Sequence, residues 1–305
     1  MPRLFFAGAF RNRLRHKVQS LINLASLAIG LTVFGFTFIY VKQELSYDRA
    51  WPDAERIHRL VIEQRGIPGL RDGLSNIVAP GDYPRMLEYF APQIDKATRL
   101  SSFGARFKDS TSTNMTAMMV ADPEFPEIFQ LEVVAGGLGR ALSGPGFIAI
   151  EESYAPTLGN NLAPGHRVLI LSSLDGELEY EVAAIYRLPE EISVRFSLLT
   201  LMHESSLPLF GARRDLSWEN RIQAWLKLKP GVETATFNEM QSTYIDLAVT
   251  IYDEVLGAGK NISDFLFYRW QPITEIHFNP VDGEARTAGD PARVATFAIV
   301  DLLVL

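Results

Sequence analysis

The sequence predicts an α+β protein in which one N-terminal transmembrane helix is followed by a two-lobed extracytoplasmic domain. Its 305 residues are enough for about two domains, and 47% of them are hydrophobic, so a folded core is expected. An uncharged apolar run, residues 18–41, predicts the helix. A strand–helix–strand pattern over residues 222–272 predicts an α+β lobe, and the strand-rich stretch before it predicts an inserted β-rich lobe.

Charge is divided unevenly along the chain. Residues 1–17 hold five basic side chains and no acidic one, and residues 18–41 hold no charged side chain. The other 24 of the 29 basic side chains lie in residues 42–305, together with all 36 acidic ones. A basic tip, a neutral apolar run and an acidic body are typical of a membrane-inserted protein and argue against a nucleic-acid partner. The sequence has no cysteine, which excludes thiolate catalysis, disulfides and cysteine-ligated metals.

The apolar run is long enough to cross a bilayer. Its 24 residues span about 36 Å as a helix, against about 30 Å for the hydrocarbon core. A cleaved signal peptide would have a shorter apolar core and a small-residue cleavage site, whereas residues 39–43 read IYVKQ. Because the basic residues precede the run, the N-terminus is expected in the cytoplasm and the domain outside.

Residues 1–17 are predicted to form a cytoplasmic, amphipathic, basic segment. Phe6, Phe10 and Leu14 recur at helical spacing, with Arg11 and Arg15 largely off that stripe. Such a helix can lie on anionic membrane lipid and simply set the topology, or it can dock a cytoplasmic partner. For the second reading, the candidate contact residues are Arg3, Phe6, Phe10, Arg11, Arg13, Leu14, Arg15 and Lys17.

Local patterns predict the elements of the domain, residues 42–290. Two apolar runs around Asp175-Gly176 predict a β-hairpin over residues 168–188. Other strands are expected at residues 56–64, 148–152, 224–231 and 265–278. Helices are expected at residues 83–92 and 234–256, the second being the longest in the domain.

Residues 294–305 are apolar apart from Asp301. Twelve residues are fewer than the roughly 20 that a spanning helix needs. Residues 291–305 therefore form either a terminal helix docked on the domain or the start of a second transmembrane helix, and we expect the second.

Motifs for enzymatic chemistry are missing from the sequence. It has neither a G-x-S-x-G nor an H-E-x-x-H motif, and His203-Glu204 lacks a second histidine nearby. Residues 257–261 resemble a phosphate-binding loop, but Glu254 and Asn261 occupy the positions where a Walker A motif needs glycine and serine or threonine. We expect no catalytic, cofactor-binding or metal-binding residues, and no ATP hydrolysis by this chain.

Several segments together resemble ABC transporter permeases of the MacB-type, FtsX-like group. The first is the apolar helix followed by ELSYDR, residues 44–49, and PDAERI, residues 52–57. Residues 121–168, AWLKLKPGVE at 224–233 and WQPITEIHF at 270–278 follow the family pattern in order and spacing. The chain departs from that pattern at Pro126, where the family usually has phenylalanine, and at Leu158-Gly159, where it usually has FG.

The resemblance implies a permease subunit in the bacterial inner membrane, with a periplasmic core domain of two lobes between its first and second membrane helices. It implies an ABC ATPase partner that drives mechanotransmission, and export of a periplasmic substrate such as an antibiotic, a peptide or a lipoprotein. A second permease half or a homodimer, and a periplasmic adaptor, are further implied partners, and no cofactor is implied. A chain that stops where the second membrane helix begins resembles a fragment of such a permease.

Helix movement would then reach the domain through a rigid stalk, for which the candidate residues are Glu44, Tyr47, Asp48, Arg49 and Trp51. The alternative is a single-span, membrane-anchored periplasmic sensory or adaptor domain without ATP coupling. A membrane-tethered enzyme is disfavoured because the sequence offers no convergent catalytic residues.

Overall fold

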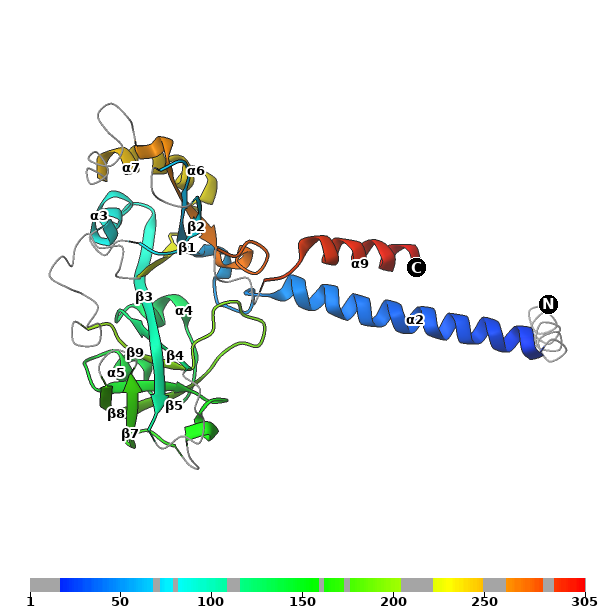
Figure 1. Cartoon of the computed structure of the whole chain (residues 1–305), viewed down its shortest axis with the longest axis horizontal. Coiled ribbons are helices and arrows are strands. Elements are labelled where there is room, and N and C mark those ends of the chain that lie inside the picture. Colours follow the sequence, from blue (N-terminus) through cyan, green and yellow to red (C-terminus); the bar gives the residue numbers. More distant parts are fainter. Residues whose placement is uncertain are drawn as a thin grey trace. The chain divides into compact units, whose positions relative to one another are not determined.

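The computed structural model describes residues 17–67, 72–78, 82–108, 116–158, 162–172, 176–203, 222–248, 262–281 and 288–304. The chain divides into two compact units. The first is a helical unit, formed by the residues before Asp48 and those from Gly289 onward. The second is the domain, Asp48–Ala288, which is built mainly of strands (Figure 1).

The helical unit contains α2 (Lys17–Ser46) and α9 (Pro291–Val304). α2 is the one helix in the described part of the chain that is long and apolar enough to cross a membrane, and most of its large apolar side chains are exposed. It continues five residues beyond the predicted end at Val41, because KQELS contains good helix formers and no proline or glycine. α9 begins where Asp290 caps it, its carboxylate accepting from the backbone N–H groups of Ala292 at 3.0 Å and Arg293 at 3.1 Å.

The α+β lobe of the domain is an antiparallel sheet with helices on one face. Its strands are β11 (Leu266–Pro272), β1 (Ile57–Gln64), β10 (Gln223–Leu228) and the first half of β3 (Ile94–Phe107), in that order, with β2 (Gly73–Ser75) beside β1. The helices are α3 (Asp82–Tyr89), α6 (Thr234–Glu239) and α7 (Gln241–Ala248). Phe90, Phe237 and Trp270 pack together between helices and sheet.

The predicted long helix over residues 234–256 is wrong as one continuous element. The helix breaks at Met240, which caps the end of α6, and α7 restarts at Gln241. Residues 249–256 lie outside the described residues. The apolar positions keep helical spacing across the break, which lets both short helices bury one face, so periodicity alone could not reveal it.

The β-rich lobe is inserted between β3 and β10 in the chain and closes into a barrel. It adds β4 (Thr116–Ala121), β5 (Glu132–Gly136), β6 (Phe147–Glu151), β7 (Arg167–Ser172), β8 (Gly176–Arg187) and β9 (Leu198–Leu201). Going around the barrel, β3 pairs with β4, followed by β9, β6, β8 and β7, and β7 returns to β3. The β7–β8 pairing confirms the predicted hairpin, with Ser172 opposite Gly176. Closure pairs these strands on both sides and encloses an apolar interior that includes Phe103, Ile148 and Val182.

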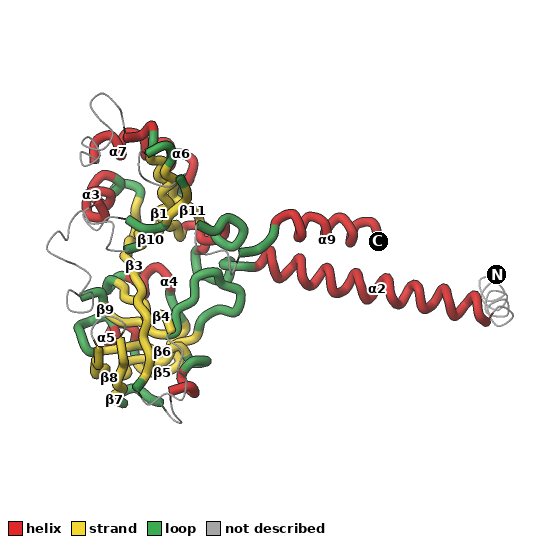
Figure 2. The backbone as a smooth tube through the Cα atoms, in the orientation of Figure 1, coloured by secondary structure: helices red, strands yellow, loops and turns green. Residues whose placement is uncertain are grey.

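The two lobes share β3 and a third apolar cluster (Figure 2). Ile57 and Trp225 enter this cluster from the α+β sheet, on the face opposite the helices. Phe125 and Phe129 enter it from α4 (Phe125–Phe129), which belongs to the inserted lobe, as does α5 (Leu138–Ala141). The first residues of the domain also enter this shared cluster, which makes its beginning the place where both lobes can be reached.

Candidate functional site: the junction segment

The sequence-predicted site residues fall into three places. Arg3, Phe6, Phe10, Arg11, Arg13, Leu14 and Arg15 lie outside the described residues. Lys17 is the first residue of α2 and is exposed. Glu44 and Tyr47 belong to the helical unit, whereas Asp48, Arg49 and Trp51 open the domain. We call residues 48–58 the junction segment, because they join α2 to the first strand of the domain.

Asp48 is the first residue of the junction segment and is fully buried. Its carboxylate accepts a hydrogen bond from the Ser193 backbone N–H at 2.8 Å and another from the Ser193 hydroxyl. Its own N–H donates to the Glu191 carbonyl at 2.8 Å. Burial raises the pKa of the Asp48 carboxyl, although the Ser193 hydrogen bonds and the charge of His277 act in the opposite direction. This Asp48 clasp (Asp48, Glu191 and Ser193) fixes the chain to the β8–β9 loop of the inserted lobe.

The Asp48 clasp depends on an unusual backbone conformation. Asp48 has a φ of 60°, in the left-handed region that aspartate tolerates better than most residues. The loop that receives it is held in turn, because the Tyr186 hydroxyl donates to the Phe196 carbonyl at 2.7 Å. The clasp therefore joins two segments whose conformations are each fixed locally.

Trp51 anchors the junction segment in the cluster shared by the lobes. It is 3% exposed, and its ring meets that of Phe129 edge-on, with centroids 5.3 Å apart. Phe129 in turn contacts Trp225 of β10, with centroids 5.4 Å apart. Arg49, by contrast, is exposed and pairs with Glu55 at 3.6 Å, a contact that contributes little. Of the predicted stalk residues in the domain, Asp48 and Trp51 are thus the ones held by packing.

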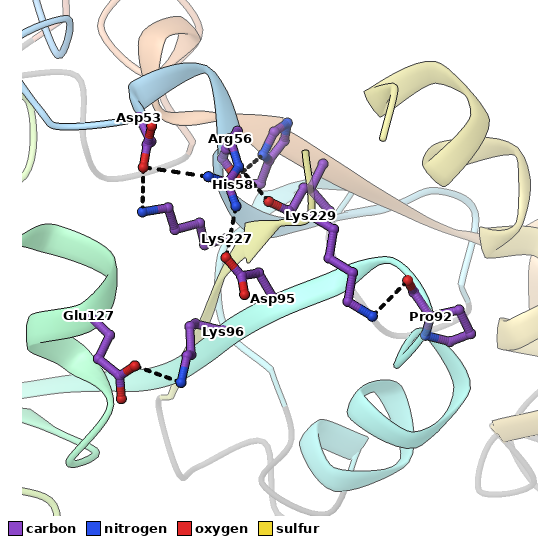
Figure 3. A network of polar contacts seen from close by, with 10 residues as sticks. Asp53, Arg56, His58, Pro92, Asp95, Lys96, Glu127, Lys227 and Lys229 are labelled. Carbon is purple, nitrogen blue, oxygen red and sulfur yellow. Dashed lines mark hydrogen bonds and ion pairs between the residues drawn. The ribbon is translucent and has the colours of Figure 1, made fainter. Parts of the chain in front are cut away.

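Asp53 begins a second set of contacts, which reaches the α+β lobe (Figure 3). Its carboxylate lies 2.6 Å from the Lys227 Nζ and 3.5 Å from Arg56. The hydrogen bond and charge of Lys227 lower the pKa of Asp53. Lys227 of β10 lies directly opposite Lys96 of β3, and Lys96 pairs with Glu127 of α4 at 2.6 Å. Two cross-strand lysines would repel each other, so each is neutralised by a carboxylate from another element.

Arg56 and His58 complete this ion-pair network at the start of β1. Arg56 donates from Nε to the Leu228 carbonyl at 2.7 Å and pairs with Asp95 at 2.7 Å. His58 is fully buried, with Nε2 at 2.7 Å from the Thr234 hydroxyl of α6 and Nδ1 at 3.0 Å from the Arg56 carbonyl. Burial lowers the pKa of His58, so its neutral form is favoured.

The first and last described parts of the domain lie close together. Trp51 and Ile57 share the apolar cluster with Ile273 and Ile276, which belong to the segment that ends the domain. His277 is buried and close enough to Asp48 for its charge to act on that carboxyl. Both ends of the domain are therefore fixed in one region.

This geometry serves to hold and transmit rather than to catalyse. Among the described residues, no group of three His, Asp or Glu side chains could hold a metal ion. The predicted His203-Glu204 pair is half outside the described residues, and residues 257–261 lie wholly outside them. Asp53, Arg56, His58, Ser193 and Lys227 were missed as site residues. The one local signal was Pro52-Asp53, a typical turn pair.

Comparison with known proteins places this geometry in a family. The family model described as the MacB-like periplasmic core domain matches residues 20–242, more than half of the chain. No curated protein matches the sequence. A solved domain of a protein described as a permease, from Porphyromonas gingivalis, is 20% identical with a TM-score of 0.56, covering 82% of this chain and 99% of its own, and shows the same fold.

Two further solved structures are more distant. The periplasmic region of MacB from Actinobacillus actinomycetemcomitans is 11% identical with a TM-score of 0.42, over 70% of this chain and 88% of its own. The extracellular domain of the ABC-type transporter YknZ from Gram-positive bacteria is 11% identical with a TM-score of 0.43, over 70% of this chain and 99% of its own. On the strength of the family match, the chain belongs to the MacB-like periplasmic core domain family of ABC-type permeases.

Proposed function

We propose that the chain is the part of an ABC-type permease subunit that couples helix movement to export of a periplasmic substrate. In this proposal it resides in the bacterial inner membrane, with its N-terminus in the cytoplasm and its domain in the periplasm. α2 is the first membrane helix, and α9 is the start of the second. The basic residues before α2, its exposed apolar side chains and the family membership support this arrangement.

The observation that carries the proposal is the double attachment of the junction segment. Its first half is held by the Asp48 clasp on the inserted lobe, and its second half by the ion-pair network on the α+β lobe. A tilt or shift of α2 enters the domain through these eleven residues, because they follow α2 directly. Two packed lobes fixed to one short segment can respond by changing between discrete arrangements rather than by bending.

The energy source is placed in a partner, because the sequence carries no Walker A motif. An ABC ATPase is the expected partner, and residues 3–17 are its candidate contact. A second permease half or a homodimer, and a periplasmic adaptor, complete the proposed assembly. The substrate class is an antibiotic, a peptide or a lipoprotein, and the described residues contribute no chemistry to its transformation.

The first test is co-purification from host membranes of the uninterrupted gene product. We expect an ABC ATPase to accompany it and to be lost when residues 3–17 are deleted. Retention of the ATPase after the deletion would remove the proposed contact. Failure of any ATPase to accompany the intact protein would favour the anchored sensor or adaptor.

The second test loosens the junction. A flexible Gly-Ser insertion between Tyr47 and Asp48 should leave ATPase binding intact but abolish export, scored by antibiotic susceptibility and lipoprotein release in the host. A matched insertion between Gly144 and Pro145, in a surface turn of the inserted lobe, should leave export unchanged. Intact export with the junction insertion would disprove transmission through this segment.

A further inference from the structure

α9 carries one acidic side chain, Asp301, in an otherwise apolar stretch. Asp301 is 7% exposed, whereas its neighbours Ile299 and Leu302 are 59% and 76% exposed. The carboxylate is therefore the side chain that α9 turns inward, toward α2, and the apolar groups face outward. This is the reverse of the pattern for a helix docked on a water-soluble core.

The partner of Asp301 is Thr37 of α2. The Thr37 hydroxyl donates to the Asp301 carboxylate, and it also lies 2.9 Å from the Val33 carbonyl of its own helix. Four residues before Asp301, Phe297 meets Tyr40 edge-on, with ring centroids 5.4 Å apart and planes at 86°. Rising residue numbers on α2 match falling numbers on α9, so the two helices are antiparallel in the helical unit (Figure 1).

Thr37 lies four residues before the end of the uncharged run at Val41, about 6 Å inside it. At that depth water is scarce, and a polar side chain is costly unless another protein group satisfies it. Apolar contacts between helices gain little there, since lipid tails are equally apolar. Specific pairing of two membrane helices must therefore come from polar contacts and close packing.

We propose that Asp301 and Thr37 form an intramembrane fastener that fixes the rotation and register of α9 against α2. The inference rests on the proposed function only in placing both helices in the membrane. The fastener makes α2 and α9 one two-helix lever. Since the first and last described parts of the domain lie close together, the lever joins the domain at one region.

The test uses the natural absence of cysteine from the sequence. Tyr40→Cys and Phe297→Cys are introduced into the uninterrupted protein, and host membranes are treated with a short bis-methanethiosulfonate reagent. We expect rapid intramolecular cross-linking. A control pair, Phe36→Cys and Ile299→Cys, replaces side chains that are 72% and 59% exposed and should cross-link at least tenfold more slowly.

The fastener is then removed in the cross-linking background. Thr37→Val and Asp301→Leu should each slow cross-linking at least threefold, whereas Thr37→Ser and Asp301→Asn, which keep a hydrogen bond, should stay within twofold. Equal rates in all four variants, or no cross-linking in the parent pair, would overturn the fastener. Alkaline carbonate extraction separates this failure from that of the proposed function, because a protein that is extracted would not be membrane-spanning at all.

Discussion

The two halves of the junction segment are attached by different physics. The first half relies on buried groups, namely the Asp48 carboxylate with its Ser193 hydrogen bonds and the Trp51 ring against Phe129. The second half relies on ion pairs whose acidic partners, Asp53 and Asp95, are nearly half exposed. Buried packing and hydrogen bonds to a buried carboxylate stabilise more strongly than ion pairs in contact with water. The attachment to the inserted lobe should therefore be the rigid one, and the attachment to the α+β lobe the adjustable one.

The largest expected effect tests the rigid half at Trp51. Trp51→Ala removes a buried ring from the cluster shared by both lobes, and we expect it to lower the free energy of unfolding by about 3–5 kcal/mol. Urea unfolding of the full chain in detergent, followed by far-UV circular dichroism, measures this. Phe267→Ala, at a ring that is 42% exposed, is the control and should cost much less. Similar losses in the two variants would show that Trp51 is not an anchor.

The next effect concerns the Asp48 clasp. Asp48→Ala removes the acceptor of two Ser193 hydrogen bonds and puts alanine at a φ of 60°, so we expect a loss of about 2–4 kcal/mol. Asp48→Asn tolerates this φ and keeps one acceptor oxygen, and should cost about 1 kcal/mol. The same urea titrations compare the variants. If asparagine proved as harmful as alanine, the negative charge and not the geometry would define the clasp.

This difference between the two halves also explains what the sequence could predict. The transmembrane helix and the 168–188 hairpin depend on local patterns, namely a run without charges and two apolar runs around Asp-Gly, and both elements are present in the structure. Asp48 and Trp51 were predicted from the family motif that contains ELSYDR. Their partners were not, because Ser193 lies 145 residues further along the chain and no local pattern records such a pairing.

The ion-pair network was equally hidden, for a topological reason. Lys227 and Lys96 become neighbours only when β10 pairs with β3, and only then does each lysine need a carboxylate nearby. The break in the predicted 234–256 helix was hidden because the apolar spacing continues through Met240. Closure of the inserted lobe into a barrel likewise depends on β7 returning to β3, which no single strand pattern indicates.

A third prediction distinguishes the two halves by the sign of their pH dependence, beginning with His58. Because burial lowers the pKa of folded His58 below 6.5, the unfolded chain takes up the proton first on acidification. The wild type should therefore lose stability relative to His58→Gln as pH falls below 6.5 toward the lowered pKa of the folded state. Urea titrations of both proteins at several pH values give this difference directly.

Asp48 should give the opposite slope in a more acidic range. Its folded pKa is raised above 3.8, so the folded state holds the proton more tightly than the unfolded chain. The wild type should therefore lose stability relative to Asp48→Asn as pH rises from 3.8 through the raised pKa. If both differences changed with pH in the same direction, the two halves would not have the opposite environments described above.

The smallest effect is expected at Asp53, on the adjustable half. Asp53→Asn removes the carboxylate that neutralises Lys227 opposite Lys96, but water reaches Asp53 and compensates in part. The loss of stability should be smaller than for Asp48→Asn and should shrink further as salt is raised, because salt screens both the ion pair and the repulsion between the lysines. Titrations at low and high sodium chloride measure it, with Glu55→Gln, at an exposed ion pair, as the control. A large, salt-independent loss at Asp53 would mean that the α+β attachment is as rigid as the Asp48 clasp, and the proposed division of labour within the junction segment would fail.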